Sequence, residues 1–417
     1  MRILWILPFV PWPVKVRSFN LLPRISQRHD INLVCVASSE EDFARLGRLR
    51  DCCDSIRTGT YDRTGALARC LMSLPTRTPL RIAYVASSSM RQAVAQSIAE
   101  KRPDVIYVER WRALQYVPPE TRIPVVCDPT DSMSLYNERL MRAGRSWERA
   151  LGLVEYLKFR RTEPVLARTV AAAVFCSQAD LDFVRRLAPD ANLVQVPNGV
   201  DCDAFSLKRM GEEQFAEIFF SGNFLYSPNR DAVRHFLKDI FPRVKRKVPE
   251  ATLTIVGNGA VKFIAAEAWH VAGIRVFDFV PELRPHLARA SVAVAPLRVG
   301  AGVSNKLLEA FAVGTTIVST RIGCGDLPCR DGEHLFLADD PVLFAERVVR
   351  LLENPPLGHA IAARAQAFVR AAYDWHIVAR LMEEVLHNAA FGKPCEAATS
   401  VIAEPAAKAR AFAAAAD

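Results

Sequence analysis

Short runs of apolar residues alternate with longer amphipathic stretches along most of the chain. Short apolar runs are typical of buried strands, and apolar positions at helical spacing between them are typical of the helices that cover a sheet. The alternation therefore predicts βαβ units on parallel sheets. One series occupies residues 1–195 and a second begins after Pro197. The expected fold class is α/β, with two doubly wound, Rossmann-like domains.

The segment Val196-Pro-Asn-Gly-Val200 is expected to join the two series, because Pro and Gly favour a turn there. The first series predicts strands at Ile3–Leu7, Ile31–Val36, Val105–Val108, Val125–Cys127 and Ala171–Phe175, and helices at Phe19–Arg28, Glu40–Leu49, Ser88–Lys101, Tyr136–Arg168 and Ala179–Leu187. The second predicts strands at Ile218–Ser221, Thr252–Val256, Ile274–Phe277, Val292–Ala295, Thr316–Ser319 and Leu335–Leu337, and helices at Asn229–Val248, Val261–Ala272, Leu283–Ala290, Lys306–Phe311 and Pro341–Leu352.

Composition narrows the class of protein. A chain of 417 residues, half of them hydrophobic, is long enough for two or three domains with sizeable cores, which excludes disordered, collagenous and disulfide-stapled classes. The ten cysteines show no CxxC pair and no zinc-ligand spacing, so we expect a reducing, cytoplasmic compartment. No apolar run is long enough to span a bilayer. Pro8, Pro11 and Pro13 interrupt the apolar start of the chain, which predicts a buried strand instead of a signal peptide.

Positive charge is concentrated in the first half of the chain. Residues 1–200 contain 29 Lys and Arg against 20 Asp and Glu, whereas residues 201–417 contain 25 of each. Much of the excess falls in Arg139–Arg161, where apolar residues recur at roughly helical spacing. This segment predicts either a solvated helix packed on the core or a helix attracted to an anionic membrane surface. No motif of a nucleic-acid-binding fold accompanies the charge, so nucleic acid is not expected as a partner.

Several nucleotide-site motifs are absent. Gly257-Asn-Gly259 begins like a dinucleotide fingerprint, but Lys262 stands where the last glycine of GxGxxG is needed. P-loop, HExxH and GxSxG motifs are missing as well, which disfavours hydride transfer, P-loop phosphoryl transfer, zincin and hydrolase chemistry. Two isolated Asp-x-Asp pairs, Asp180/Asp182 and Asp201/Asp203, are weak signals for a metal, and we expect neither a metal nor a cofactor.

The strongest chemical signal lies between residues 295 and 314. A strand ends there in a glycine-rich loop that continues into a helix, and such a junction directs backbone N–H groups and a positive helix end at an anion. Gly300 and Gly302 allow close approach of the backbone. Arg298 and Lys306 flank the loop with two cations that suit a diphosphate.

Glu309 follows Lys306 by three residues and therefore lies on the same helix face, where it can accept hydrogen bonds from a ribose diol. The plainer alternative is a glycine turn followed by an ordinary Lys306–Glu309 surface pair.

This stretch resembles the donor site of the GT-B glycosyltransferases, in particular the family 4-like retaining enzymes of bacterial polysaccharide and glycan biosynthesis. The resemblance extends through four further stretches in the expected order. They are Val196-Pro-Asn-Gly-Val-Asp201 with Phe205, Phe220-Ser-Gly-Asn223 with Tyr226-Ser-Pro-Asn229-Arg-Asp-Ala, Thr254-Ile-Val-Gly257, and Asp331-Gly-Glu-His-Leu-Phe-Leu-Ala-Asp-Asp-Pro341. It is firm over residues 196–390 and loose in the first half.

The resemblance implies two domains facing a cleft, with a nucleotide-sugar donor held mainly by the second. Arg298 and Lys306 would bind its diphosphate and Glu309 its ribose. Gly222, Asn223, Gly302 and Asn305 would complete the donor site. The implied activity is transfer of a sugar to a glycan or lipid-linked acceptor, with retention of configuration and without a metal, in polysaccharide or related glycan biosynthesis.

The resemblance also sets the expected domains. We place the acceptor-side domain at residues 1–195 and the donor-binding domain at 196–364. A helix at about 365–390 would cross back to the first domain, and the Ala-rich residues 391–417 would form a flexible tail. The basic first half suggests an acceptor that is anionic or held at the cytoplasmic face of a membrane.

Two departures from the family pattern leave alternatives open. Many members have a Glu eight residues before the ribose-binding Glu, where this chain has Ala301, and many have a His near the reacting carbon, whereas the only histidine of the first half is His29. A nucleotide-sugar 2-epimerase of the same fold and a catalytically inactive donor-binding partner subunit are therefore alternatives.

Candidate catalytic groups of the first half lie where a strand ends. Asp128 and Asp131 follow the strand at Val125–Cys127, at the edge where open α/β sheets bind their ligands. Either would act as a base if the reaction inverts, or would orient the acceptor if it retains; the structural alternative for Asp131 is capping of the next helix. Glu109 and Arg110 are reserve candidates, and the resemblance places Arg17 on the acceptor side. Trp12 is expected to stack on a sugar or to pack.

Overall fold

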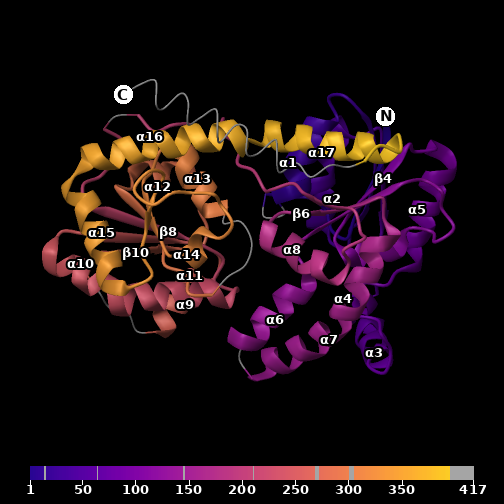
Figure 1. Ribbon diagram of the computed structural model, residues 1–417, viewed down its shortest axis with the longest axis horizontal. Helices are drawn as coiled ribbons and strands as arrows, with labels where there is room; N and C mark the ends of the chain where they lie inside the picture. The colour runs from indigo at the N-terminus through magenta and orange to yellow at the C-terminus, as the bar shows by residue number, and fades with distance from the viewer. Residues whose placement is uncertain are drawn as a thin grey trace. The chain divides into compact units, whose positions relative to one another are not determined.

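The structure is a computed structural model that describes residues 1–394 apart from 14–15, 63, 144–145, 210, 268–271 and 300–304. The chain forms two compact units (Figure 1). Unit 1 contains Met1–Pro197 and the described residues from His376 onward, and unit 2 contains Asn198–Trp375. The tail expected after Ala390 lies, beyond Pro394, outside the described residues.

Unit 1 is built on a seven-stranded parallel sheet with the strand order β3-β2-β1-β4-β5-β6-β7. Most of its strands are buried on both faces, as their nearly continuous apolar runs predict. The strands are β1 (Arg2–Leu7), β2 (Asp30–Val36), β3 (Ser55–Gly59), β4 (Val105–Glu109), β5 (Val125–Thr130), β6 (Ala172–Phe175) and β7 (Leu193–Gln195). The helices are α1 (Val16–Ile25), α2 (Glu40–Gly47), α3 (Thr64–Ser73), α4 (Leu80–Tyr84), α5 (Ser88–Lys101), α6 (Met133–Ala143), α7 (Ser146–Thr169) and α8 (Gln178–Leu187), with short 3₁₀ turns η1 (Arg50–Cys52) and η2 (Trp111–Tyr116).

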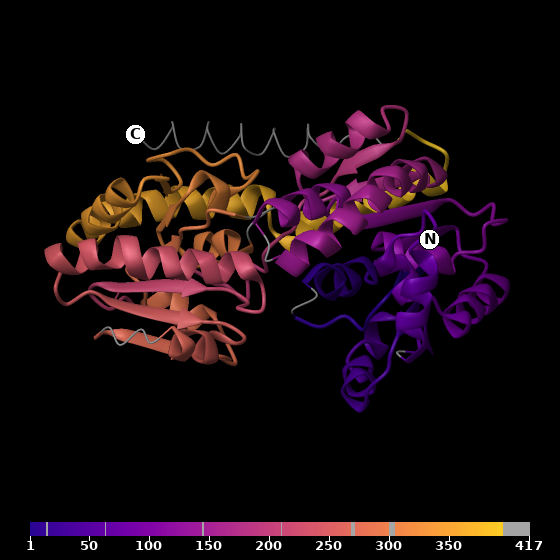
Figure 2. The ribbon, with the colours of Figure 1, turned by 90° about the horizontal axis from the view of Figure 1, so that it is seen from below.

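Unit 2 is built on a six-stranded parallel sheet with the order β10-β9-β8-β11-β12-β13. Its strands are β8 (Glu217–Ser221), β9 (Thr252–Val256), β10 (Ile274–Phe277), β11 (Val292–Ala295), β12 (Ile317–Ser319) and β13 (Phe336–Leu337). Its helices are α9 (Ser227–His235), η3 (Phe236–Ile240), α10 (Phe241–Lys247), α11 (Ala260–Ala266), α12 (Arg284–Arg289), α13 (Asn305–Val313), α14 (Arg321–Cys324), α15 (Pro341–Glu353) and α16 (Pro355–Ala372). Figure 2 shows α9, the single π-turn η3 and α10 as one continuous rod beside the strands.

Two expected helices are interrupted. The single helix expected at Tyr136–Arg168 is two helices, α6 and α7, which pack against each other. The helix expected at about 365–390 is also two, α16 and α17 (Trp375–Ala390), because the backbone of Val200 bonds to the chain between them. Val200 N donates to Tyr373 O (2.9 Å) and Trp375 N donates to Val200 O (3.1 Å), which holds residues 373 and 374 out of both helices.

An ion pair joins α17 to the first part of unit 1, beside the buried apolar side chains of this helix. Arg28, at the end of the α1 segment, donates two nitrogens to the Glu383 carboxylate of α17, with a shortest distance of 2.6 Å. His29 lies 3.5 Å from the same carboxylate and 3.3 Å from the amino group of Met1. His29 therefore sits at the amino edge of the sheet. No helix among the described residues is both long and apolar enough to cross a membrane.

A buried carboxylate fixes the start of α6. Glu163 of α7 accepts hydrogen bonds from the backbone N–H groups of Met133 (3.0 Å) and Ser134 (3.1 Å), from the Ser132 hydroxyl (2.9 Å) and from the Trp111 indole (2.9 Å). Burial raises the pKa of Glu163, and these donors oppose the shift. Sequence alone does not identify such a cap, because Glu163 comes 30 residues after the first residue of the helix that it caps.

We predict that Glu163→Leu destabilises unit 1 by about 2–4 kcal/mol, because it leaves several buried donors without an acceptor. The free energy of unfolding from urea titration, followed by circular dichroism, measures the loss. Exposed Glu120→Leu is the control and should change stability by less than about 0.5 kcal/mol. Equal effects of the two substitutions would show that the cap has no energetic role.

Candidate functional site

The candidate residues of unit 1 gather at the carboxyl edge of its sheet. Strand order reverses between β1 and β4, and ligands of open α/β sheets bind where this reversal occurs. Arg17 lies in the first turn of α1 after β1, Glu109 ends β4, and Asp128 and Asp131 lie at the end of β5. The sequence-predicted groups are thus brought to one edge by the topology.

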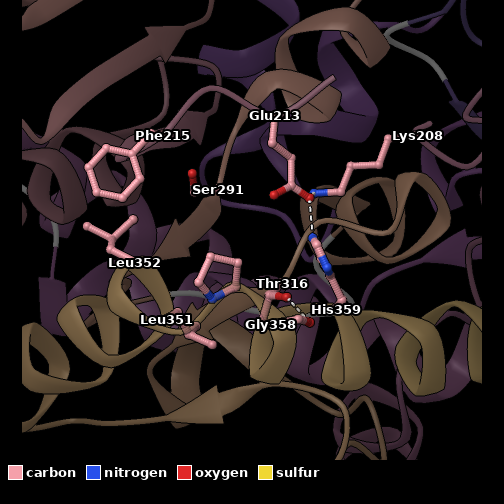
Figure 3. Close-up of a pocket in the computed structure, with 10 residues that line it drawn as sticks. Lys208, Glu213, Phe215, Ser291, Thr316, Leu351, Leu352, Gly358 and His359 are labelled. Atoms are coloured by element: carbon pink, nitrogen blue, oxygen red, sulfur yellow. Dashed lines mark hydrogen bonds and ion pairs between the residues drawn. The ribbon is translucent and has the colours of Figure 1, made fainter. Parts of the chain in front are cut away.

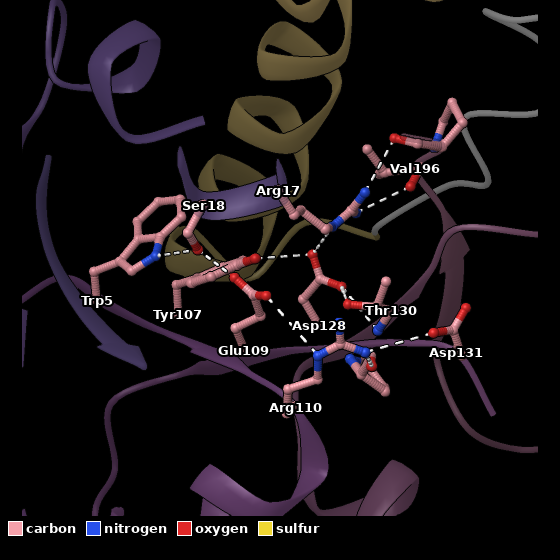
Figure 4. A network of polar contacts seen from close by, with 12 residues as sticks. Trp5, Arg17, Ser18, Tyr107, Glu109, Arg110, Asp128, Thr130, Asp131 and Val196 are labelled. Atoms are coloured by element: carbon pink, nitrogen blue, oxygen red, sulfur yellow. Dashed lines mark hydrogen bonds and ion pairs between the residues drawn. The ribbon is translucent and has the colours of Figure 1, made fainter. Parts of the chain in front are cut away.

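Asp128 is fully buried and is the centre of a hydrogen-bonded network (Figure 4). Its carboxylate accepts from Arg17 Nε, from the Tyr107 hydroxyl (2.8 Å) and from the backbone N–H of Thr130 (3.0 Å). Tyr107 in turn stacks on Trp5 with ring centroids 3.9 Å apart. With its oxygens bonded in this way, Asp128 has a clear structural role as the counterion of Arg17; its catalytic role stays a prediction.

Arg17 faces into unit 1. Its guanidinium donates to the carbonyl oxygens of Val196 and Pro197, each at 3.0 Å, in addition to Asp128. Burial opposes the positive charge of Arg17, but the Asp128 carboxylate raises the pKa of Arg17 above its ordinary value. Only 3% of the side chain is exposed, so Arg17 ties the last residues of unit 1 to the sheet. Its expected contact with an acceptor stays a prediction.

Asp131 is the accessible carboxylate of this edge. Its side chain is 40% exposed and lies 3.5 Å from Arg110 Nη1. It does not cap α6, because Glu163 and the Ser132 hydroxyl accept the N–H groups of the first turn. Asp131 also contributes, after burial, to raising the pKa of neighbouring Asp180 to about 6.

Two of the four described non-glycine residues that have a positive φ lie at the same edge. Arg110 has φ +75° and Thr130 has φ +73°, in the left-handed region that non-glycine residues rarely adopt. Strained residues of this kind tend to cluster at functional sites. Glu109, which precedes Arg110 in the chain, accepts a hydrogen bond from the Ser18 hydroxyl, and burial raises the pKa of Glu109. Trp12, on the loop before α1, packs under the Arg45 guanidinium at 4.2 Å.

The candidate residues of unit 2 also gather at the carboxyl edge of its sheet, where the strand order reverses between β8 and β11. Gly222 and Asn223 follow β8, Arg298 follows β11, and Lys306 and Glu309 lie on α13. Gly302 and neighbouring Gly300 and Ala301 lie outside the described residues. Asn305 begins α13, and its buried side-chain oxygen has no hydrogen-bond partner among the described residues.

Lys306 is partly buried and is held by α9. Its ammonium donates to Asn229 Oδ1 (3.0 Å) and lies 4.5 Å from the centre of the Phe220 ring. Burial lowers the pKa of Lys306 to about 8, and Glu309 opposes the shift. Burial raises the pKa of Glu309 to about 7, and Lys306 opposes it. No described residue donates a hydrogen bond to the Glu309 carboxylate.

Asn229 explains why glycine is needed after β8. A Cβ on Gly222 would lie 2.8 Å from the Asn229 side chain, and a Cβ on Gly257, which has φ +155°, would lie 1.7 Å from Gly222 O. Asn229 Nδ2 also donates to Asn223 O (2.9 Å). The ends of β8 and β9 and the side chain that holds Lys306 are therefore packed in direct contact. Asn223 itself accepts the N–H of Leu225 (2.9 Å) and shapes the turn.

Arg298 is held by the same helix. Two of its nitrogens donate to Asp231 of α9, at 3.0 and 2.6 Å, while half of its side chain stays exposed. Asn229 and Asp231 both lie in the first turns of α9, so this one helix contacts both predicted cations. Sequence analysis identified both cations but not the residues that bind them, Asn229 and Asp231. The only available signal was the motif Tyr226-Ser-Pro-Asn229-Arg-Asp, which had no assigned role.

The comparisons with known proteins agree with this geometry. Residues 216–354 match the family model described as Glycosyl transferases group 1. The chain is similar to the Anabaena protein HepE, solved in complex with UDP and glucose, with a TM-score of 0.67 at 15% identity over 93% of this chain and 100% of that one. It is also similar to WaaG, a glycosyltransferase involved in lipopolysaccharide biosynthesis, with a TM-score of 0.63 at 13% identity over 93% and 99%. The chain has the GT-B fold of glycosyltransferases.

Two curated relatives add to the comparison. A phosphatidyl-myo-inositol mannosyltransferase of Mycobacterium tuberculosis (strain ATCC 25618 / H37Rv) is 32% identical over 224 residues, which is 50% of this chain and 58% of that protein. An uncharacterized 44.6 kDa protein in the cps region of Klebsiella pneumoniae is 21% identical over 359 residues, 84% of this chain and 89% of that protein. The chain spans a little over half the length of the curated mannosyltransferases that it matches.

A pocket of this GT-B chain lies away from the candidate site (Figure 3). It is lined by residues that precede β11 and β12, at the amino edge of the unit 2 sheet. Lys208 pairs with Glu213 (2.6 Å), which also bonds His359 (2.9 Å), and burial lowers the pKa of Lys208. Because its charged groups are bonded to one another and lie at the opposite edge, this pocket is not a donor site. Among the described residues no three His, Cys, Asp or Glu side chains are placed to hold a metal ion.

Replacement of Asp128 by Asn tests its structural role as the counterion of Arg17. We predict a loss of about 3–5 kcal/mol in the free energy of unfolding, because Arg17 would remain buried without its counterion. Asp131→Asn breaks only a partly exposed pair and should cost at most about 1 kcal/mol. Urea titration of both variants measures the difference, and an Asp128→Asn protein as stable as Asp131→Asn would contradict the structural role.

Proposed function

We propose that the protein transfers a sugar from a nucleotide-sugar donor to a glycan or lipid-linked acceptor. The observation that carries the proposal is that α9 contacts Lys306 through Asn229 and Arg298 through Asp231 at the carboxyl edge of unit 2, within the residues that match Glycosyl transferases group 1. Two cations at the same edge of one sheet are suited to a group with two negative charges, such as a diphosphate.

The proposed chemistry follows from this charge. Negative charge grows on the departing nucleoside diphosphate as the glycosidic bond breaks, and fixed cations that meet this charge lower the barrier. Lys306 and Arg298 would supply them, so the reaction as proposed needs no metal. Glu309 would accept hydrogen bonds from the ribose hydroxyls, since its carboxylate has no described donor of its own.

On the acceptor side we propose Asp131, because it is exposed at the carboxyl edge of unit 1 whereas Asp128 is buried. With retention of configuration, as the family resemblance favours, Asp131 would orient the acceptor hydroxyl. GDP-mannose is the first donor to test, since a Mycolicibacterium smegmatis relative that is 27% identical over 224 residues is described as GDP-mannose-dependent. UDP-glucose is the second, because HepE was solved with it. The mannosyltransferase relatives favour a glycolipid acceptor.

The donor site is tested by thermal shift with GDP-mannose and UDP-glucose. A ligand at a hundred times its dissociation constant stabilises the folded state by about 2.7 kcal/mol. Lys306→Ala should abolish the shift, and Lys262→Ala, an exposed lysine of the same unit, should retain it. If neither nucleotide sugar shifts the folded protein, the donor site is refuted. Conversion of the donor without any acceptor would instead favour the epimerase, and binding without turnover the inactive partner subunit.

The affinity for the donor should depend on pH, because binding needs a charged Lys306 and Asn229 helps to keep Lys306 charged. Above pH of about 8 the free protein loses the Lys306 proton, so affinity for the nucleotide sugar should fall, by up to tenfold per pH unit. Below about 7 protonation of Glu309 should weaken ribose binding. Isothermal titration across this range measures the profile.

Asn229→Leu removes the oxygen that accepts from the Lys306 ammonium and therefore favours the uncharged amine. The alkaline fall should then begin at lower pH, because the pKa of Lys306 drops further. Lys306→Arg is the control, since arginine stays charged and the alkaline fall should disappear. An Asn229→Leu profile identical to that of wild type would contradict the positioning role of Asn229.

A further inference from the structure

The turn η2 contains a buried arginine atom that has no partner. Arg112 lies in η2, which directly follows β4 at the carboxyl edge of unit 1. The Arg112 Nε atom is buried and has no hydrogen-bond partner among the described residues. No described carboxylate forms an ion pair with its guanidinium either. A buried donor without an acceptor is unfavourable, and an anion that binds at Arg112 would supply the acceptor.

Two further arginines lie near Arg112. Arg110 precedes it by two residues, and Arg81 belongs to α4. The Tyr116 hydroxyl of η2 donates to Val85 O (2.6 Å) at the end of α4, which holds α4 against η2. Burial lowers the pKa of Arg112, and the like charges of Arg110 and Arg81 lower it further. Three cations are therefore gathered beside one another.

The acids near this group pair with the other two arginines. Arg110 Nη1 lies 3.5 Å from the Asp131 carboxylate (Figure 4). Arg81 Nε lies 4.0 Å from the buried Glu155 carboxylate, and 41% of the Arg81 side chain stays exposed. Arg112 and Arg81 thus combine an unpartnered guanidinium with an accessible one, and we name the pair the Arg81–Arg112 site.

We propose that the Arg81–Arg112 site binds a phosphate group of the acceptor. A guanidinium donates parallel hydrogen bonds to phosphate oxygens and stays charged, so two arginines suit a group with two negative charges. Arg110 connects this site to Asp131, the carboxylate proposed to orient the acceptor hydroxyl. The acceptor would therefore carry a phosphate near the hydroxyl that receives the sugar.

The site differs from the basic segment singled out in the sequence. The charge excess of the first half was traced to Arg139–Arg161, whereas Arg81 and Arg112 lie outside that range and come together only in the folded chain. That the phosphate belongs to the acceptor rests on the proposed function. The presence of an anion site does not, because it follows from the unpartnered Arg112 and its cationic neighbours.

Phosphorus NMR of inorganic phosphate, at constant ionic strength, tests the site. The full chain with Lys306→Ala is the parent protein, because this substitution disables the proposed donor site. The parent should broaden the phosphate line. Adding Arg112→Gln should weaken binding by about tenfold or more, since hydrogen bonds from a charged donor are lost, and Arg81→Gln should weaken it as well. Arg168→Gln, an exposed arginine paired with Asp190 at the amino edge, is the matched control and should bind as the parent.

Stability separates binding from a structural role of Arg112. Arg112→Gln should not lower the melting temperature, because the substitution breaks no hydrogen bond or ion pair of the described residues. A lower melting temperature with unchanged phosphate binding would overturn the proposal. So would a parent protein that does not broaden the phosphate line.

Glucose 1-phosphate distinguishes an acceptor site from a site for a free anion. It should bind the parent more tightly than inorganic phosphate, and Asp131→Asn should remove the difference, because the sugar hydroxyls would lose their contact. Equal affinity for the two probes would overturn the assignment to the acceptor. The thermal shift of Arg112→Gln alone with nucleotide sugar should equal that of wild type, so failure at this site is distinguishable from failure of the donor site.

Discussion

The polarity of a parallel sheet is the constraint on which the rest of this structure depends. When all strands run the same way, the loops that follow them meet at one edge, and the reversal of strand order leaves a gap there that side chains from distant segments share. Both units use this edge in the same manner. In unit 1 it brings Arg17, Asp128 and Asp131 together, and in unit 2 it brings Lys306, Arg298 and the first turns of α9 together.

The charged side chains at the two edges differ in how far they are buried. In unit 1 the Arg17 cation is enclosed, and Asp128 and two backbone carbonyls satisfy it, so the pair supports the fold. In unit 2 Arg298 remains half exposed and Glu309 has no described donor. Charge that remains accessible to solvent is what a ligand can use, so on this ground we propose the edge of unit 2, and not the buried pair of unit 1, as the donor site.

The sequence predicted most strands of both sheets and the chemistry of the donor edge, because both leave local signals. Apolar runs mark buried strands, and the glycine-rich stretch with Arg298 and Lys306 is contiguous. It missed β3, whose sequence Ser-Ile-Arg-Thr-Gly contains no apolar run, and β7, which has only three residues. It also joined α6 to α7 and α16 to α17. It also missed Asn229 and Asp231, since these act on residues 77 and 67 positions away and only the folded chain brings them together. The burial of Asp128 was hidden for the same reason, because Arg17 lies 111 residues from it.

The break between α16 and α17 has a consequence for how the chain is assembled. Val200, two residues after the chain enters unit 2, is hydrogen-bonded to Tyr373 and Trp375, where the chain leaves it. Unit 2 is thus a continuous insertion whose two ends are tied side by side, as is typical of a module that can be gained or exchanged whole. Unit 1, by contrast, is discontinuous in sequence. It is complete only after the ribosome has synthesised the entire insertion and α17 has been added.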